Sequence, residues 1–344
     1  MTESVHPVLV TATQFRQQLL RNEDVATQRL AQFYTVAFQR LGTQIEALVA
    51  VLDGQVMTPS QAAEIAQLRA FQQAIVTEIT RFGVAADLEM SRLTTESIEL
   101  ALNHSTGLVE AYFQSPEARA ALRASFTSLV PEQVETLAGF LAPESPLHDA
   151  LTEQLGNAVA EQVSSKMVES IARGANPLTV AAEIRRDLGL GLSWAVNTVR
   201  TANLWAYREA TRANYIANSR VVGGWTWHAT LDNRVCGSCL SQHGTQHELT
   251  ETLNGHHQCR CVMIPELPLA KSLGLELPEI ETGEDWFRRQ QQETQNEILG
   301  LGMAQAWRDG QVQFSQFSRE YQSEVYGSML RMASMKDLGV DDDN

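Results

Sequence analysis

All four cysteines of this chain fall within one window of 26 residues, and this clustering constrains the fold more than any other sequence feature. The remaining 318 of its 344 residues contain none. Because a secreted protein stapled by disulfides spreads its cysteines through a small chain, the clustering indicates a metal site in a reducing compartment. Free core cysteines or a disulfide are the alternatives.

The candidate metal ligands form two groups separated by a linker. The first is the C-x-x-C pair of Cys236 and Cys239. The second group consists of His256, His257, Cys259 and Cys261. Structural zinc takes four nitrogen or sulfur ligands in a tetrahedron, supplied as paired knuckles across a loop. We therefore expect a zinc ion held by the first pair together with either both remaining cysteines or His256 and one cysteine.

The sequence on either side of the cysteines is typical of β-structure. Residues 225–230 alternate and are rich in β-forming residues, which predicts a strand, and residues 261–264 predict a returning strand. Such a unit is too small to fold by burial alone, so the metal is expected to hold it together. Catalytic zinc keeps an open position beside a general acid or base. The enzymatic alternative is a nuclease that uses His256 or His257 as its base, but no histidine follows His257.

The N-terminal two-thirds of the chain predicts long helices. Apolar residues recur from Tyr34 to Leu52 in steps of four and three, a heptad-like seam. Pro59 is expected to begin a second helix that Gly83 ends, with a third over residues 84–113. Ser115 then restarts the chain before a proline, and an apolar stripe recurs every four residues over 147–171.

The segment before the cysteine window predicts a pair of helices. Asn176-Pro177 is a helix cap, the glycines at 189 and 191 end the first helix, and Ser193 caps a second helix over residues 194–219. A face of small residues on the second helix suggests core packing: Ala202, Ala206, Ala210, Ala213 and Ala217. Downstream, Trp286 and Trp307 are expected as core anchors of a C-terminal helical segment.

The fold class that follows is mainly α, with an extended helical body, a small β-hairpin zinc-knuckle unit and a C-terminal helical segment. The expected regions are residues 1–175, 176–220, 221–268 and 269–344. The formal charge of −15 argues against a chain that grips DNA along its whole surface. No apolar run is long enough to span a membrane, and the first residues do not form a secretory signal.

One local stretch of positive charge stands out against this acidic background. Residues 177–220 contain six arginines and three acidic residues, a local balance of +3. Arg200, Arg208 and Arg212 are therefore candidates for weak contact with nucleic acid. Since arginine pairs with carboxylate as well as with phosphate, surface salt pairing is the favoured interpretation in an acidic chain.

The residues around the knuckles resemble a known family. They are Trp225, Trp227, Ala229, Asp232, Arg234, the four cysteines, Gly244, His256 and Arg260. This pattern is similar to phage head morphogenesis or minor head proteins, the families related to the F protein of phage Mu and protein 7 of phage SPP1. The resemblance extends over residues 177–317. It departs at Ala202, where the family often has a glutamate after Arg-Thr.

The resemblance implies a structural minor capsid protein of a tailed phage or prophage, without enzymatic activity. Such a protein associates with the portal inside the head and assists head assembly and DNA packaging or delivery. The expected partners are the portal protein and major capsid or scaffold proteins, with packaged DNA as a further contact and several copies around the portal. The expected location is the virion, and the host cytoplasm during assembly. The alternatives are the nuclease named above and a zinc-containing DNA-binding protein, whose affinity would fall steeply with salt.

Overall fold

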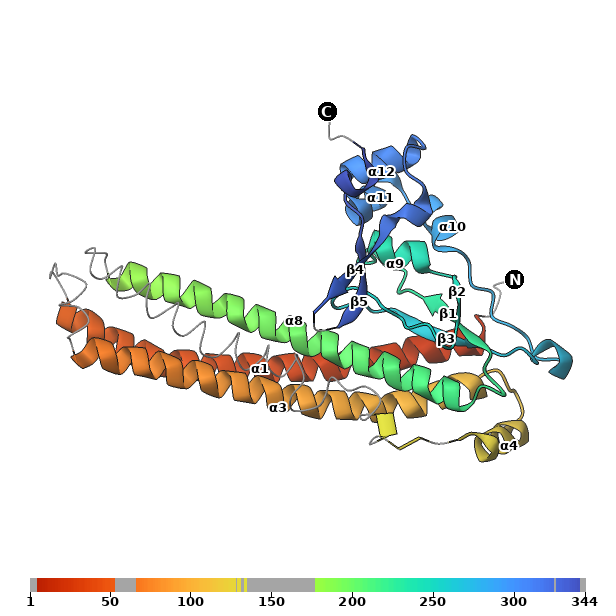
Figure 1. The fold of residues 1–344 in the computed structure, drawn as a ribbon, viewed down its shortest axis with the longest axis horizontal. Coiled ribbons are helices and arrows are strands. Elements are labelled where there is room, and N and C mark those ends of the chain that lie inside the picture. The colour runs from red at the N-terminus through yellow and green to blue at the C-terminus, as the bar shows by residue number, and fades with distance from the viewer. Residues whose placement is uncertain are drawn as a thin grey trace. The chain divides into compact units, whose positions relative to one another are not determined.

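A computed structural model describes residues 5–52, 66–127, 129–130, 133–134, 177–324 and 326–340. Three long helices, coloured from red to green in Figure 1, dominate the described part of the chain, and one short helix lies between the second and the third in sequence. The α-helices are α1 (Pro7–Leu52), α3 (Ala66–Glu110), α4 (Pro116–Ser125), α8 (Pro177–Ala217), α9 (Gly237–Gln242), α10 (Gly283–Arg288), α11 (Gln292–Leu299) and α12 (Leu301–Arg308). The strands are β1 (Gly224–His228), β2 (Gln246–Glu248), β3 (Val262–Glu266), β4 (Ser318–Ser323) and β5 (Gly327–Met332). Short 3₁₀ turns cover Lys271–Leu273, Phe314–Phe317 and Lys336–Leu338. The structure is thus mainly helical with small antiparallel sheets, as the sequence predicts.

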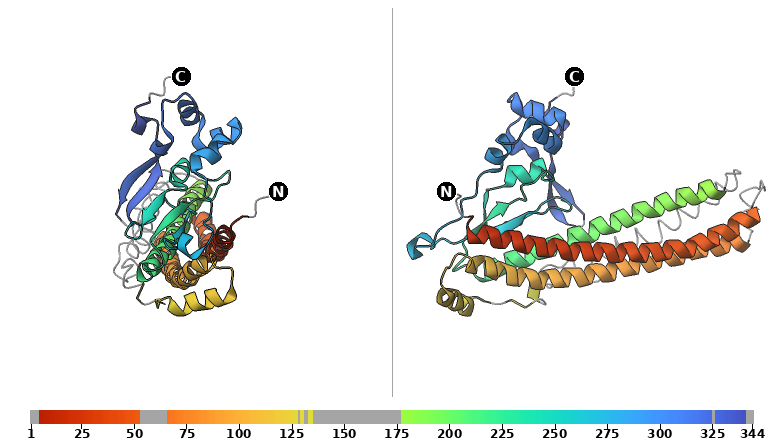
Figure 2. Two further views of the ribbon diagram at one scale, coloured as in Figure 1. Left: turned by 90° about the vertical axis from the view of Figure 1, so that its right-hand side faces the viewer. Right: turned by 180° about the vertical axis from the view of Figure 1, so that it is seen from behind.

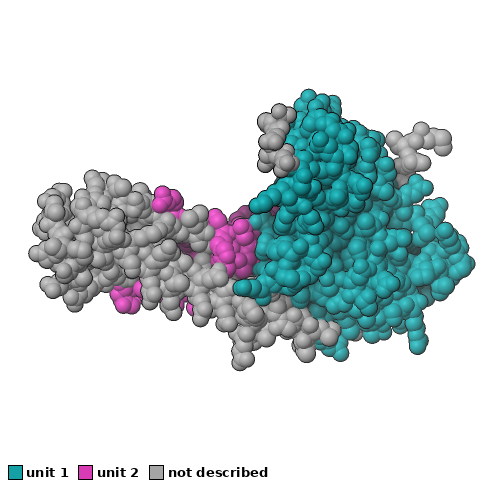
Figure 3. Space-filling model, turned by 45° about the horizontal axis from the view of Figure 1, so that its top comes forward, with its two compact units in different colours: residues 1–20, 95–138, 204–344 teal, residues 21–94, 139–203 magenta. Residues whose placement is uncertain are grey.

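The chain divides into two compact units, distinguished by colour in Figure 3. Unit 1 comprises Met1–Leu20, Thr95–Ala138 and Leu204–Asn344. Unit 2 comprises Arg21–Thr94 and Gly139–Asn203. The helices α1, α3 and α8 each contribute residues to both units.

Unit 2 is built from long helices that bury one apolar face. On α3 the buried side chains follow steps of three and four, which place them on one side of a helix: Ile75, Ile79, Phe82, Ala86, Met90 and Leu93. Leu41, part of the expected seam on α1, is also buried. Buried carboxylates on these helices are paired with arginines, for example Glu78 with Arg40 and Arg81.

Unit 1 contains a three-stranded antiparallel sheet in the order β2-β1-β3. Strands β1 and β3 confirm the two strands predicted beside the cysteines, whereas β2 was not foreseen. Tyr112 from the chain just after α3 donates a hydrogen bond to the carbonyl of Pro265 (2.7 Å), and Tyr215 of α8 donates to that of Met263 (3.3 Å). These helix side chains satisfy backbone carbonyls of β3 that pair with no other strand among the described residues.

The C-terminal region is only partly the helical segment that the sequence predicts. Three short helices form as expected, and Trp307 is buried against Phe287 with a ring separation of 4.9 Å. The prediction is wrong for residues 318–332, which form the hairpin β4-β5. Figures 1 and 2 show this hairpin next to the three-stranded sheet, and the amide of Leu330 donates to the carbonyl of Asn254 (2.7 Å). The hairpin strands expose charged residues on both faces, so they lack the alternation that marks a strand.

Two predicted helix breaks are wrong. Helix α3 continues through Gly83, and α8 is one helix of 41 residues that continues through Gly189 and Gly191. An interior glycine costs a helix only about 1 kcal/mol, and on α3 the burial of a long apolar face offsets this cost. The expected helix pair before the motif is therefore a single helix. The restart at Ser115 is confirmed, since its side chain accepts a hydrogen bond from the amide of Ala118 (3.0 Å) at the start of α4.

Some predictions fall on residues outside the described part. These are the helix start at Pro59 and the stripe over 147–171. The small-residue face of α8 is buried at Ala202, Ala206 and Ala210, which confirms core packing there. The four regions expected from the sequence stay a prediction. Within the described residues, no helix has the length and apolar character that crossing a membrane requires.

Candidate metal centre

Strand β1 supplies the platform on which the cysteine window folds. Its two tryptophans, Trp225 and Trp227, are buried, and the indole N–H of Trp225 donates to the carbonyl of Glu248 (3.1 Å). Strand β1 pairs with β3 from Gly224 opposite Glu266 to His228 opposite Val262. In this register β3 begins at Val262, immediately after Cys261. The sheet therefore fixes the position of the backbone at Cys261, where the cysteine window ends.

The first knuckle is the turn that begins α9. Cys236 is the N-cap of this short helix, and its sulfur accepts a hydrogen bond from the amide of Cys239 (3.3 Å). Both sulfurs therefore lie on one side of the turn. A Cβ at position 237 would lie 2.7 Å from Cδ2 of Leu299, so a larger residue there would displace the leucine side chain.

The second knuckle is a tight turn with the same spacing. The amide of Cys259 donates to the carbonyl of His256 (3.1 Å), and Gln258 adopts the left-handed conformation with φ of 57°. The imidazole Nδ1 of His256 donates to the carbonyl of His257 (2.6 Å). Because a carbonyl can only accept, Nδ1 carries a proton and Nε2 faces the opposite way. A metal-bound histidine uses its second nitrogen in this manner.

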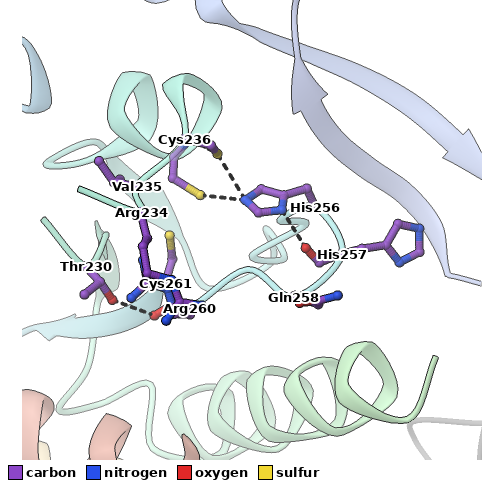
Figure 4. A pocket seen from close by; sticks show the side chains of 10 residues that line it. Thr230, Arg234, Val235, Cys236, His256, His257, Gln258, Arg260 and Cys261 are labelled. Carbon is purple, nitrogen blue, oxygen red and sulfur yellow. Dashed lines mark hydrogen bonds between the residues drawn. The ribbon is translucent and has the colours of Figure 1, made fainter. Parts of the chain in front are cut away.

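The two knuckles bring their donor atoms together (Figure 4). His256 Nε2 lies 3.1 Å from the sulfur of Cys236 and 3.2 Å from that of Cys239, and 3.5 Å separates the sulfurs of Cys239 and Cys259. Two groups of possible ligands result, Cys236 with Cys239 and His256, and Cys239 with Cys259 and Cys261. The four cysteines and His256 therefore belong to one cluster, in which Cys239 is common to both groups, whereas the candidate His257 belongs to neither group.

The donor set fits zinc. All four cysteines are free thiols, which excludes the disulfide alternative in this structure. Zinc–sulfur bonds of about 2.3 Å in a tetrahedron keep sulfurs slightly less than 4 Å apart, close to the separation of Cys239 and Cys259. Soft thiolates with one imidazole are the ligands that structural zinc prefers.

Crowding of the thiols changes their acidity. A hydrogen bond from Cys239 lowers the pKa of Cys236 to about 5. Burial opposes this shift, and the hydrogen bond with His256 adds to it. Burial lowers the pKa of His256, but its contacts with the thiols, Cys236 above all, outweigh burial and raise that pKa to about 9. The Cys236 thiol is therefore a thiolate at neutral pH, which is the form that binds a metal.

A charged brace joins the two knuckles. The guanidinium of Arg260 donates to both carboxylate oxygens of Asp232 (2.6 and 2.7 Å), and the same carboxylate accepts from the amide of Arg234 (3.0 Å). The hydrogen bond from Arg260 lowers the pKa of Asp232. Asp232 thus ties the turn before the first knuckle to the second knuckle.

A cavity of about 350 Å³ opens beside the cluster. Its lining consists of Thr230, Arg234, Val235, Cys236, Cys239, His256, His257, Gln258, Arg260 and Cys261. None of these lining residues is an aspartate or glutamate. Figure 4 shows the ring of His257 pointing away from Cys236, and burial and the nearby His256 lower its pKa.

The three arginines proposed for nucleic acid contact all bond to protein groups. Arg200 lies 3.6 Å from Glu23 and 3.7 Å from Asp24, and Arg212 pairs with Glu209 (2.8 Å). Arg208 is buried and donates to the carbonyls of Cys259 and Cys261. Salt pairing is thus present at two of them, and contact with nucleic acid stays a prediction.

Two residues beside the site were missed in the sequence. Arg16 of α1 is buried and donates to the carbonyl of His228 (3.2 Å) at the end of β1. Gly255 precedes the second knuckle, and a Cβ there would lie 2.5 Å from the sulfur of Cys259. A glycine next to a metal-ligand pair is a signal that could have been recognised, whereas nothing local to Arg16 indicates a role more than 200 residues away.

The fold and the site define a mainly helical protein that carries a cluster of cysteines and one histidine able to hold a metal ion. Residues 161–264, fewer than a third of the chain, match the model of the family of phage Mu protein F like proteins. This match confirms the resemblance to phage head morphogenesis and minor head proteins. It includes β1, both knuckles and the start of β3, but ends before the downstream residues whose similarity the sequence also suggested. No curated protein and no solved structure matches the chain.

Proposed function

We propose that this chain is a structural minor head protein of a tailed phage or prophage. In this proposal it associates with the portal inside the head and assists head assembly and DNA packaging or delivery. Its partners are the portal protein and major capsid or scaffold proteins, with several copies around the portal. It is found in the virion, and in the host cytoplasm during assembly. The family match over the knuckle region is the observation that carries the proposal.

The second part of the proposal is that the Cys/His cluster holds zinc as a structural brace and that the chain is not an enzyme. Three of the cysteines, Cys239, Cys259 and Cys261, are at most 5% exposed. The cavity beside them offers no carboxylate as an acid or base. Bound zinc would supply cross-linking of two chain segments, a role suited to a site packed into a core.

We infer that Cys236, Cys239, His256 and Cys259 hold the ion. Each knuckle then contributes residues three apart. The contacts in the structure link Cys236 to His256, His256 to Cys239, and Cys239 to Cys259. Cys261 stays beside them as a further thiol. Elemental analysis and cobalt substitution test this set. We expect Cys261→Ser to keep the cobalt–thiolate absorption and Cys259→Ser to lose part of it, and the reverse result would exchange their roles.

Deletion of the gene from the phage or prophage that encodes this chain tests the head function. We expect fewer infectious particles, and recovery with the wild-type gene but not with Cys239→Ser. Mass spectrometry of purified virions should detect the chain. Normal yields without the gene, together with absence of the chain from virions, would contradict the proposal.

The enzymatic alternative is tested with purified full-length protein and plasmid DNA in the presence of zinc or magnesium. We expect no cleavage. Cleavage that disappears in His257→Ala, a residue outside the inferred ligand set, would support the nuclease instead. Tight DNA binding that weakens steeply with salt would support the DNA-binding alternative.

A further inference from the structure

Two buried arginines from different helices reach the cysteine cluster. Arg16 lies on α1 and is 7% exposed, and Arg208 lies on α8 and is 6% exposed. Both belong to unit 1, as does the whole metal centre. Among the described residues, neither forms an ion pair with a carboxylate, and the Nε atom of each is buried without a hydrogen-bond partner.

Arg208 contacts the second knuckle directly. Its Nη2 donates to the carbonyl of Cys259 (2.5 Å) and to that of Cys261 (3.3 Å). Gly255 leaves room for this arrangement, because a Cβ there would lie 3.3 Å from Nη1 of Arg208 as well as against the Cys259 sulfur. The guanidinium therefore fixes the backbone of both cysteines from the side of α8.

Arg16 approaches the same cluster from the other helix. It holds the carbonyl of His228, whose strand partner is Val262, the residue after Cys261. Burial lowers the pKa of Arg16, while its electrostatic interaction with Cys261 and Cys259 opposes this shift. The neighbouring imidazoles of His228 and His243 have pKa values lowered mainly by burial, so they are neutral and bring no competing charge.

The charges of these groups complement those of a metal centre. A divalent ion with three thiolates and one imidazole carries a net charge of −1, and with four thiolates −2. Isolated buried cations are costly, and so is an isolated buried anion, but each offsets the cost of the other. The Arg260 guanidinium on the same knuckle is already neutralised by Asp232, and Arg234 beside the cavity is exposed. Among the described arginines near the cluster, Arg16 and Arg208 are therefore the ones that are buried without a carboxylate partner.

We propose that Arg16 and Arg208 are the buried counter-charges of the metal centre and that they hold α1 against the end of β1 and α8 against the second knuckle. This inference rests on the proposed zinc site. Both are positioning residues, since they bond to backbone carbonyls and not to the ion. Metal binding is consequently coupled to the packing of helices whose sequences contain no metal ligand.

Zinc affinity of the full-length chain, measured by competition with a chromophoric chelator, tests the proposal. Arg208→Met and Arg16→Met keep an apolar side chain of similar length and remove the charge. We expect each to weaken zinc binding by about tenfold or more, as loss of groups supporting metal ligands usually does. Arg208→Lys keeps the charge, so we expect it to recover most of the affinity.

Arg212→Met is the matched control on α8, because Arg212 pairs with Glu209 and touches no cysteine. Its zinc affinity should equal that of the wild type. If Arg208→Met and Arg16→Met bind zinc as tightly as the control while only their thermal stability falls, the two arginines are packing residues and the inference is overturned. If Arg208→Met fails to fold, the Lys variant decides, because wild-type zinc binding by that variant supports a role of charge and a large loss contradicts it. If the wild-type protein binds no zinc, the zinc site itself is overturned. That result differs from tight zinc binding by the wild type and by both Arg→Met variants, which would overturn only the role of the arginines.

Discussion

The helices of unit 2 and the metal centre of unit 1 both bury polar groups, but they satisfy them differently. In unit 2, Glu89 is 7% exposed and has two arginine partners, Arg29 and Arg92. Similar pairs recur along the helices, so each ion pair contributes only a small part of the stability of unit 2. In the metal centre, five donors from two short turns meet at one point. Distributed contacts should tolerate the loss of any one residue, whereas a concentrated site should not.

Removal of the metal should have the largest effect. Structural zinc contributes about 10–16 kcal/mol of binding free energy in small metal-dependent folds, comparable with the entire stability of a domain. We expect chelation, or Cys239→Ser, to expose Trp225 and Trp227 and shift their fluorescence to longer wavelength. The helical circular dichroism should fall far less, because the unit 2 helices have their own core.

Ser241→Ala on the same short helix is the control for Cys239→Ser and should leave the tryptophan emission unchanged. If the chelated protein keeps buried tryptophans and a wild-type melting temperature, the contrast between the two regions is wrong.

The close approach at Gly255 should give the next largest effect. An added methyl at this buried position meets the Cys259 sulfur at 2.5 Å, and overpacking of this kind costs about 1–3 kcal/mol. We expect Gly255→Ala to lower the free energy of unfolding by this amount and to weaken zinc binding, as urea denaturation and chelator competition would show. Gly302→Ala in α12 is the control, since its methyl would meet only Met335 at 3.9 Å. A neutral or stabilising Gly255→Ala would show that the second knuckle is loosely packed.

The clustering of the cysteines with His256 was more predictable from the sequence than the fold around it. The spacing of Cys236, Cys239, His256 and Cys259 identifies two knuckles because ligand chemistry depends on local turns. The helix breaks expected at Gly83 and Gly189 failed because a local glycine penalty is smaller than the gain from tertiary packing. The hairpin over residues 318–332 and the role of Arg16 could not be found, since both depend on contacts between distant segments.

The brace between Asp232 and Arg260 should have a moderate effect. Its geometry is bidentate, but the carboxylate side chain is 36% exposed, so solvent screening limits the loss in Asp232→Asn to about 1 kcal/mol. The pKa of Asp232 lies below its ordinary value of 3.8 in the folded chain. Its contribution is therefore complete above about pH 4 and is lost as the pH falls through the lowered pKa. Acid titration of unfolding should show this part of the pH dependence in the wild type and not in Asp232→Asn, and identical profiles would exclude the brace.

The smallest effect is expected in unit 2, at the pair between Arg29 and Glu89. The Arg29 side chain is 44% exposed and its Nη1 lies 3.3 Å from the carboxylate, so Arg29→Gln should cost about 0.5 kcal/mol or less. Arg92 remains bonded to the same carboxylate at 2.5 Å and keeps that buried charge paired. Replacing both arginines leaves the carboxylate without these partners, and the double variant should lose more stability than the sum of the single changes. Urea denaturation of the three variants measures this difference. A loss above 2 kcal/mol from Arg29→Gln alone would show that unit 2 also depends on single contacts, and the contrast with the metal centre would then disappear.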